Sequence, residues 1–171
     1  NPRRVWVAIY LCSFIIWWAE VSSWPSYFII LLFIVKPESK LWHTLKENLK
    51  GFHLTRFENW AVPGVPDVHG CKDGIPFWIE LKVMKGNKIN LSPHQIMWNY
   101  KYSLHGGRSF IMAQPLGLGL LYIFPGSLVH SIASIGSRTE PKWTFDLSSW
   151  PWTQLGTLLL HCPLPLPPSQ Q

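Results

Sequence analysis

The pattern of apolar and polar positions divides the chain near residue 36. Before that point two apolar runs, Val5–Ala19 and Tyr27–Val35, follow Arg3 and Arg4. The longer run falls short of the roughly 20 residues that a helix needs to cross a bilayer. Basic residues followed by an apolar stretch are also typical of a signal peptide. We therefore expect residues 1–36 to be either a membrane or signal segment, or an extension separate from the chemistry of the chain.

Helical spacing begins after this segment. Apolar residues three and four positions apart are Leu41, Trp42, Leu45 and Leu49. Pro37 suits the first helical position, and Gly51 suits the position just past the end. At 100° per residue, Glu38 shares the apolar face of this helix and Glu47 lies on the opposite face. The pattern thus predicts one inward and one outward carboxylate.

A strand pattern follows the helix. Residues 52–60 are expected to be extended, and Asp73-Gly74 predicts a two-residue hairpin turn between strands over Asp67–Lys72 and Pro76–Val83. In the second strand Phe77, Ile79, Leu81 and Val83 point one way, and Trp78, Glu80 and Lys82 point the other. Two charged residues on one face of so apolar a strand are unusual, because unpaired charge is costly to bury.

A second helix is expected from Pro93 to about Leu104. Ser92 and Gln95 form a capping box around its first turn, and Gly106-Gly107 ends it. Strands are expected over Arg108–Gln114 and Leu120–Phe124. The pattern weakens past Pro125, although residues 148–161 favour a Trp- and Leu-rich helix covering the sheet. The succession of helix, hairpin, helix and strands indicates an α/β fold.

Composition and charge narrow the classes of protein to which the chain can belong. Apolar residues make up 47% of the chain and charged residues 14%, which supports a packed core and excludes a disordered chain. The net charge of +6 permits an anionic partner such as nucleic acid or a membrane surface. Cys12, Cys71 and Cys162 are far apart, so a disulfide framework and a thiolate zinc site are not expected.

The candidate chemistry is a pair of carboxylates with a lysine. Pro66-Asp67 is followed, across the predicted hairpin, by Glu80-Leu81-Lys82. Two carboxylates on adjacent strands can converge on a hard divalent cation, which activates water and neutralises charge on a phosphate. Lys82 projects from the same strand face as Glu80, and Glu38 could add a third carboxylate. The same residues would also suit a solvated ion pair beside an ordinary Pro-Asp turn.

Other polar residues have alternative interpretations. Glu58 competes with Glu38 as the third carboxylate. The capping box accounts for Gln95 without any role in chemistry. We interpret His94 as a surface residue or phosphate contact, and His69 as an ordinary strand residue near the expected metal.

These motifs resemble the PD-(D/E)xK nuclease superfamily, in particular its VRR-NUC and archaeal Holliday-junction-resolvase-like branch of phage type. The resemblance covers roughly residues 37–125. It rests on the helix-borne Glu38 and on the segments Gly64–Asp67, Ile79–Lys82 and Leu91–Gln95. It implies a restriction-endonuclease-like core in the order αβββαβ, with a central mixed sheet flanked by helices. It also implies hydrolysis of DNA phosphodiester bonds dependent on Mg²⁺ or Mn²⁺.

The resemblance implies a role for each matching residue. Asp67, Glu80 and Glu38 would be metal ligands, Lys82 the catalytic lysine, and Gln95 a polar residue of the site carried by a helix. The hydrophobic N-terminal stretch and the proline-rich end depart from the family pattern.

The expected partner is duplex or branched DNA. Lys85, Lys88, Lys101 and Lys40 are candidate phosphate contacts, which are independent of base sequence. No base-reading motif is present, so selection of DNA structure is expected rather than of sequence. Resolvase-like members act as dimers, and a homodimer with an interface in the apolar C-terminal region is the expected assembly.

The expected organisation has three parts, which are a hydrophobic segment over 1–36, a nuclease domain over 37–161 and a disordered proline-rich tail over 162–171. The expected location is the cytoplasm, of the producing cell or of a virus-infected host. Two other functions stay open: a non-catalytic nucleic-acid-binding module whose carboxylates form structural ion pairs, and a small membrane-anchored protein.

Overall fold

The structure of the protein is a computed structural model that describes residues 37–58, 62–140, 142–149 and 151–165. The predictions for residues 1–36 and for the last six residues lie outside the described part. Over the described residues, no helix combines the length and the apolar character that crossing a membrane requires.

Up to Pro125, the helices and strands follow one another in the order that the sequence predicts. The elements are α3 (Pro37–Asn48), β1 (His53–Arg56), β2 (Val68–Lys72), β3 (Ile75–Met84), α4 (Pro93–Leu104), β4 (Ser109–Pro115), β5 (Leu120–Pro125), α5 (Val129–Ile135), β6 (Trp143–Asp146) and α6 (Trp152–His161). From α3 to β4 the order is helix, three strands, helix, strand, which confirms the expected αβββαβ order. Short 3₁₀ turns flank α5 and follow β6.

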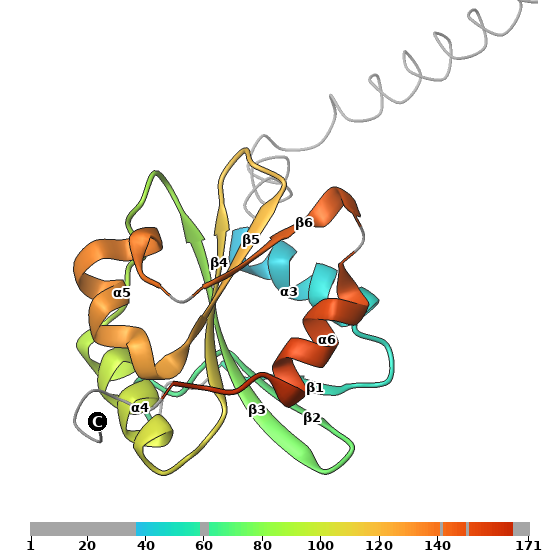
Figure 1. Ribbon diagram of the computed structural model, residues 1–171, viewed down its shortest axis with the longest axis horizontal. Helices are drawn as coiled ribbons and strands as arrows, with labels where there is room; N and C mark the ends of the chain where they lie inside the picture. Colours follow the sequence, from blue (N-terminus) through green and yellow to red (C-terminus); the bar gives the residue numbers. More distant parts are fainter. Residues whose placement is uncertain (1–36, 59–61, 141, 150, 166–171) are drawn as a thin grey trace, which may run out of the picture. The chain divides into compact units, whose positions relative to one another are not determined.

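The strands form one six-stranded sheet in the order β1-β2-β3-β4-β5-β6. All neighbours pair antiparallel except β3 and β4, which are parallel. A parallel pair needs a crossover connection, and α4 supplies it (Figure 1). The sheet is therefore mixed and the class α/β, as expected.

Each face of the sheet has its own hydrophobic core. On one face, α3 and α6 pack against Phe77, Ile79 and Leu81 of β3 (Figure 1). On the other face, Met84 of β3 belongs to a smaller core that includes Ile132 of α5. The alternation predicted for β3 is therefore confirmed, and its even-numbered residues face the layer of α4 and α5.

Local signals explain where the elements begin and end. Asp73 and Gly74 both have positive φ, 51° and 76°, as a tight hairpin turn requires. Gly51 ends the turn after α3 with φ 86°. At the start of α4 the Ser92 hydroxyl accepts from the Gln95 N–H at 3.2 Å, and the Gln95 side chain accepts from the Ser92 N–H at 2.9 Å. The predicted capping box is thus confirmed.

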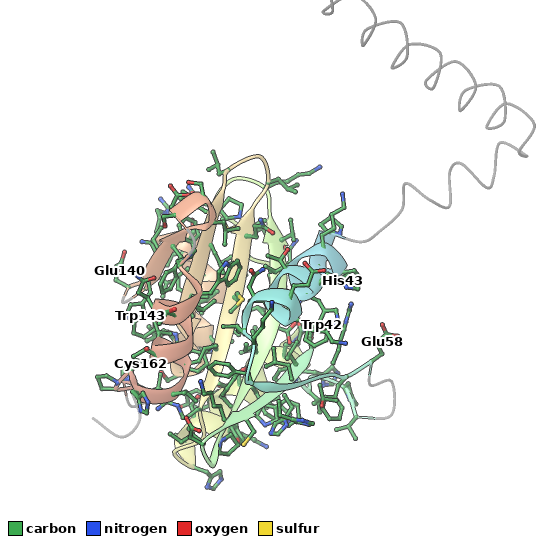
Figure 2. All side chains as sticks on the ribbon, turned by 90° about the vertical axis from the view of Figure 1, so that its right-hand side faces the viewer. Trp42, His43, Glu58, Glu140, Trp143 and Cys162 are labelled. Atoms are coloured by element: carbon green, nitrogen blue, oxygen red, sulfur yellow. The ribbon has the colours of Figure 1, made fainter. Side chains whose placement is uncertain are left out.

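The orientation of α3 also follows the prediction. Leu41, Trp42 and Leu45 are buried against the sheet, and Figure 2 shows Trp42 on this helix. Glu38 is half-buried at the first turn, whereas Glu47 is exposed. The helix therefore carries one carboxylate toward the body of the domain.

Helix α6 completes the hydrophobic core that α3 forms with the sheet. Leu155, Leu158 and Leu159 of α6 are buried in it, and Gly156 lets the helix approach the Phe52 ring, which a Cβ would meet at 3.1 Å. The expectation that the apolar C-terminal region is an exposed dimer interface is wrong for these residues, because this domain already buries them. The homodimer itself stays a prediction.

Arg108, just before β4, links the end of α6 to the sheet through hydrogen bonds. The Arg108 side chain donates to the carbonyl oxygens of Leu159 at 3.0 Å and Cys162 at 3.1 Å, and more weakly to that of Leu158 at 3.4 Å. The last carbonyls of a helix have no partner within the helix. Arg108 thus satisfies the end of α6 and holds it on the sheet.

We expect Arg108→Met to lower the free energy of unfolding by about 1–3 kcal/mol, because half-buried carbonyls lose a charged donor. Urea denaturation followed by circular dichroism measures this change. Arg138→Met removes an exposed arginine and is the matched control. Equal stability of the two variants would contradict this account of α6.

Candidate active site

The hairpin of β2 and β3 brings the two predicted carboxylates together. Val68 pairs with Ile79 in the antiparallel register, so one step further outward Asp67 stands opposite Glu80. The Asp67 Oδ2 accepts a hydrogen bond from the backbone N–H of Leu81 at 2.8 Å. This bond holds the Asp67 carboxylate against β3 just before β2 begins.

Glu80 is fully buried, with 0% of its surface exposed. Its Oε1 accepts from the Gln95 Nε2 at 2.5 Å and lies 2.9 Å from the Lys82 Nζ. Its Oε2 is buried and has no hydrogen-bond partner among the described residues. Burial and the adjacent Asp67 carboxylate raise the pKa of Glu80 to about 7, although Lys82 opposes this shift.

Lys82 and Gln95 form the other side of the site. The Lys82 side chain is 18% exposed, and its Nζ lies 3.3 Å from the Gln95 Oε1. The same Gln95 oxygen closes the capping box of α4. Gln95 therefore caps α4 and also contacts Glu80 and Lys82, and its role in the chemistry stays a prediction.

Two further charges act on Asp67 from neighbouring elements. Burial raises the pKa of Asp67 above its usual value, and the Glu38 carboxylate adds to this rise. The Leu81 N–H, Lys82 and Arg56 oppose the rise. The Arg56 Nη1 also donates to the Ser39 Oγ at 3.2 Å, so it links β1 to the first turn of α3.

Arg56 was not singled out from the sequence. The one signal in the sequence is that Arg56 follows Leu54 by two residues, which places both side chains on the same face of a strand. In the structure this face of β1 is half-buried. Of the two competing carboxylates, Glu38 is the one that acts on Asp67. Glu58 is exposed after β1 and projects outward (Figure 2).

The donor set suits a hard divalent cation. Asp67 and Glu80 offer carboxylate oxygens, and the Glu80 Oε2, which has no partner in the described part of the chain, is buried where an ion would compensate it. Within the described residues, no three His, Cys, Asp or Glu side chains lie close enough together to bind a metal. Mg²⁺ typically binds one or two carboxylates together with waters and phosphate oxygens, so a pair fits it. The role of Glu38 as a third ligand stays a prediction.

The candidate phosphate contacts lie on one loop and on two helices of the domain. Lys85 and Lys88 are exposed on the loop after β3, Lys101 on α4, and Lys40 on α3. The first two flank Asn87, whose carbonyl accepts from the Ser137 N–H at 2.9 Å. The loop that follows the candidate active site is therefore anchored, while its lysines reach solvent.

The two histidines near the site have structural contacts. The His69 ring packs on Trp78 of the neighbouring strand, with centroids 4.8 Å apart. His94 is exposed, and its backbone carbonyl approaches Gly64 so closely that a Cβ there would lie at 2.4 Å. Gly64 also has φ 91°, so the loop before Asp67 docks on α4 through a glycine-specific contact.

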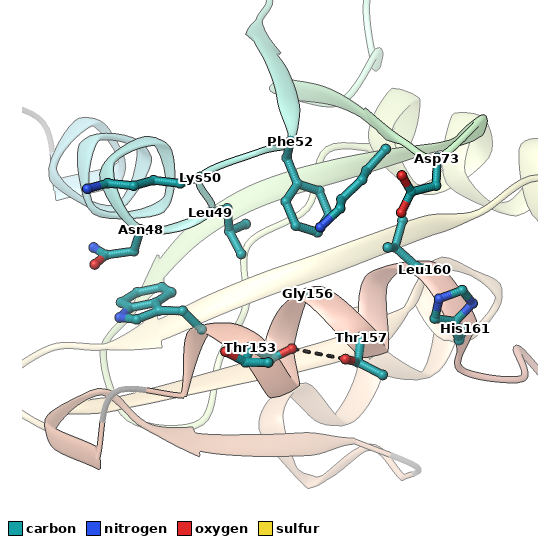
Figure 3. A pocket seen from close by; sticks show the side chains of 12 residues that line it. Asn48, Leu49, Lys50, Phe52, Asp73, Thr153, Gly156, Thr157, Leu160 and His161 are labelled. Carbon is teal, nitrogen blue, oxygen red and sulfur yellow. Dashed lines mark hydrogen bonds between the residues drawn. The ribbon is translucent and has the colours of Figure 1, made fainter.

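A cavity of about 310 Å³ lies elsewhere, between the end of α3, the hairpin turn and α6 (Figure 3). Lys50, Phe52, Asp73 and Thr157 are among the residues that line it. None of the predicted catalytic residues does so. The convergent carboxylates, not this cavity, are therefore the candidate active site.

No protein-family model matches the chain, and neither does any curated protein. Among solved structures, the chain is similar to Hjc, a Holliday junction resolvase from the archaeal hyperthermophile Archaeoglobus fulgidus. The two are 21% identical, the match covers 67% of this chain and 88% of that chain, and the TM-score is 0.43. The VRR-NUC and phage-type parts of the resemblance stay predictions.

The pKa of Glu80 generates a stability prediction. Glu80 keeps its proton up to about pH 7 in the folded protein but loses it near 4.5 when unfolded. The folded state therefore loses stability as the pH rises from about 4.5 to 7. We expect Glu80→Gln, which cannot ionise, to be more stable than the wild type at pH 8, by on the order of 3 kcal/mol, and nearly equal at pH 4.5.

Urea denaturation in EDTA at both pH values measures this difference. Glu47→Gln, on the exposed side of α3, is the control and should show no such trend. A stability difference between Glu80→Gln and the wild type that is the same at both pH values would contradict a raised pKa.

Proposed function

We propose that this chain is a metal-dependent endonuclease that hydrolyses DNA phosphodiester bonds. The observation that supports this most is the convergence of Asp67, Glu80 and Lys82 at one buried point, with one carboxylate oxygen of Glu80 unpartnered among the described residues. Two carboxylates repel an anionic substrate unless a cation binds between them, even with a lysine nearby. A phosphate substrate that binds together with a metal ion meets this requirement.

Asp67 and Glu80 would hold Mg²⁺ or Mn²⁺, with Glu38 contributing directly or through water. When bound, the cation supplies Lewis acidity that activates water and neutralises charge on the phosphate. Holding it requires Glu80 to be ionised, and the Lys82 ammonium at 2.9 Å favours that form.

The residues of the chain then have distinct tasks. Lys82 orients the attacking water or stabilises the charge that develops on the scissile phosphate. Gln95 is a positioning residue, because its amide contacts both Glu80 and Lys82 from the first turn of α4. Water adds to phosphorus as the bond to the 3′ oxygen breaks, leaving a 5′-phosphate and a 3′-hydroxyl.

Binding would rest on phosphate contacts. Lys85, Lys88, Lys101 and Lys40 are exposed, and contacts of this kind carry no base specificity. Selection of branched DNA, action as a homodimer, and a cytoplasmic location in the cell or infected host belong to the same proposal.

Replacement of the three central residues tests the function. We expect Asp67→Asn, Glu80→Gln and Lys82→Met each to reduce Mg²⁺-dependent cleavage by roughly 100-fold or more, since each removes charge from the reacting centre. Labelled four-way junctions and linear duplexes, with Mg²⁺ or EDTA, provide the assay.

Glu47→Gln and Lys46→Met change exposed residues of α3 and are the matched controls. DNA binding without cleavage of either substrate, indifferent to metal and to the three replacements, would favour the non-catalytic binding module instead.

Metal binding can be measured without DNA. At pH 8 we expect Mn²⁺ at 10 to 100 times its dissociation constant to raise the free energy of unfolding by about 1.5–3 kcal/mol. Asp67→Asn should abolish the gain, whereas Glu47→Gln should keep it. An equal gain in both variants would mean that the ion binds elsewhere.

A further inference from the structure

A row of aromatic side chains runs beside the candidate active site. It comes from four elements or their ends, and we call it the aromatic row. Its members are Phe57, His69, Trp78, Trp98 and Tyr102. None of them was assigned a role by the nuclease motif.

The rings of the row contact one another through Trp78 and Trp98. The Trp78 ring lies 5.4 Å from that of Phe57, 4.8 Å from that of His69 and 5.4 Å from that of Trp98, measured between centroids. The Trp98 and Tyr102 rings are stacked at 4.8 Å with an interplanar angle of 20°. Tyr102 is backed by Gly107, where a Cβ would lie 2.3 Å from the ring. The row is therefore continuous and supported from behind.

Strands β2 and β3 place two rings of the row close to the candidate active site. Trp78 stands two residues before Glu80 in β3, on the same face and about 7 Å away along the strand. His69 pairs with Trp78 in the register and follows Asp67 by two residues. The Phe57 N–H donates to the Asp67 carbonyl at 2.8 Å.

Helix α4 also places rings of the row close to the candidate active site. Gln95, Trp98 and Tyr102 are spaced by three and four residues in α4, so they share one helical face. The face that brings the amide to Glu80 and Lys82 therefore also presents the indole and phenol rings.

The aromatic row belongs to neither hydrophobic core. Its rings are partly exposed, and Phe57 is the most open at 39%. Trp78, Trp98 and Tyr102 are half-buried rings, and each carries one polar group. Rings of this kind are enriched at binding interfaces.

We propose that the aromatic row binds unpaired nucleobases of the strand being cut, so that the substrate class is DNA with a single-stranded segment next to the scissile phosphate. This inference rests on the proposed nuclease function. Bases stack on aromatic side chains only where they are unstacked from their own neighbours, because a duplex keeps their faces covered. Lys101, exposed beside Tyr102 in the sequence of α4, supplies charge for the phosphates of that strand.

Binding of three probes in EDTA tests the inference. They are a 20-nucleotide oligothymidylate, the same backbone made of abasic residues, and a 20-base-pair duplex, each labelled for fluorescence anisotropy. Stacking is worth enough per base that the wild type should prefer oligothymidylate over the abasic strand by roughly five-fold or more.

Trp98→Leu should lose that preference while keeping its affinity for the abasic strand, and Trp98→Phe should restore much of it. Tyr100→Leu changes a ring of the same helix that packs on His130, and should leave the preference intact. Circular dichroism verifies that each variant is folded. Equal binding of oligothymidylate and abasic strand by the wild type, or equal loss of both in Trp98→Leu, would overturn the inference.

Cleavage separates this inference from the function on which it rests. A duplex with an unpaired segment and a fully paired duplex are cut with Mg²⁺ by the wild type and by Trp98→Leu. The proposed substrate class predicts faster cutting of the first by the wild type and equal rates in the variant. Cutting of both at equal rates by both proteins would keep the nuclease and remove the role of the aromatic row. A base preference lost in Trp98→Leu, without cleavage of any substrate, would keep the base contact and remove the nuclease.

Discussion

The antiparallel register of β2 and β3 is the constraint on which the site depends. It places Asp67 opposite Glu80, and the turn at Asp73 and Gly74 fixes it because both residues accept positive φ. A slip of one residue would turn Glu80 and Lys82 toward the core of α3 and α6, where charge has no partner. The burial of Phe77, Ile79 and Leu81 on that face opposes such a slip. One hairpin thus supplies both the stability of the sheet and the spacing of the carboxylates.

Contacts between the hairpin and α4 hold the residues of the site together. Gln95 bonds Glu80 and Lys82 and at the same time caps its own helix, so the start of α4 and the middle of β3 hold each other. Gly64 adds a second link, because its lack of a side chain lets the loop before Asp67 approach His94. Since α4 is the crossover that makes β3 and β4 parallel, the topology of the sheet brings its N-terminus to the site.

Local signals made much of this predictable. The hairpin, the alternation of β3, the capping box and the inward turn of Glu38 depend on residues within a few positions of one another, and all four are observed. The helix expected over residues 148–161 is observed as α6, whereas α5 and β6 were missed because both are short and form by packing on the sheet. Arg56 and the aromatic row could not be foreseen for a related reason. Trp98 and Tyr102 have helical spacing, but their contact with Trp78 exists only once α4 folds over β3.

The energetics of Glu80 argue against a purely structural role for the Glu-x-Lys pair. A buried ion pair seldom stabilises a fold more than apolar residues of the same volume would. Here the cost is larger still, because Asp67 adds a like charge and one oxygen of Glu80 has no partner among the described residues. Exposed pairs such as that between Glu140 and Lys142 carry no such cost, since water solvates them. A cation bound between Asp67 and Glu80 would relieve both the repulsion and the missing contact, so the feature that costs stability is also the one that favours a metal.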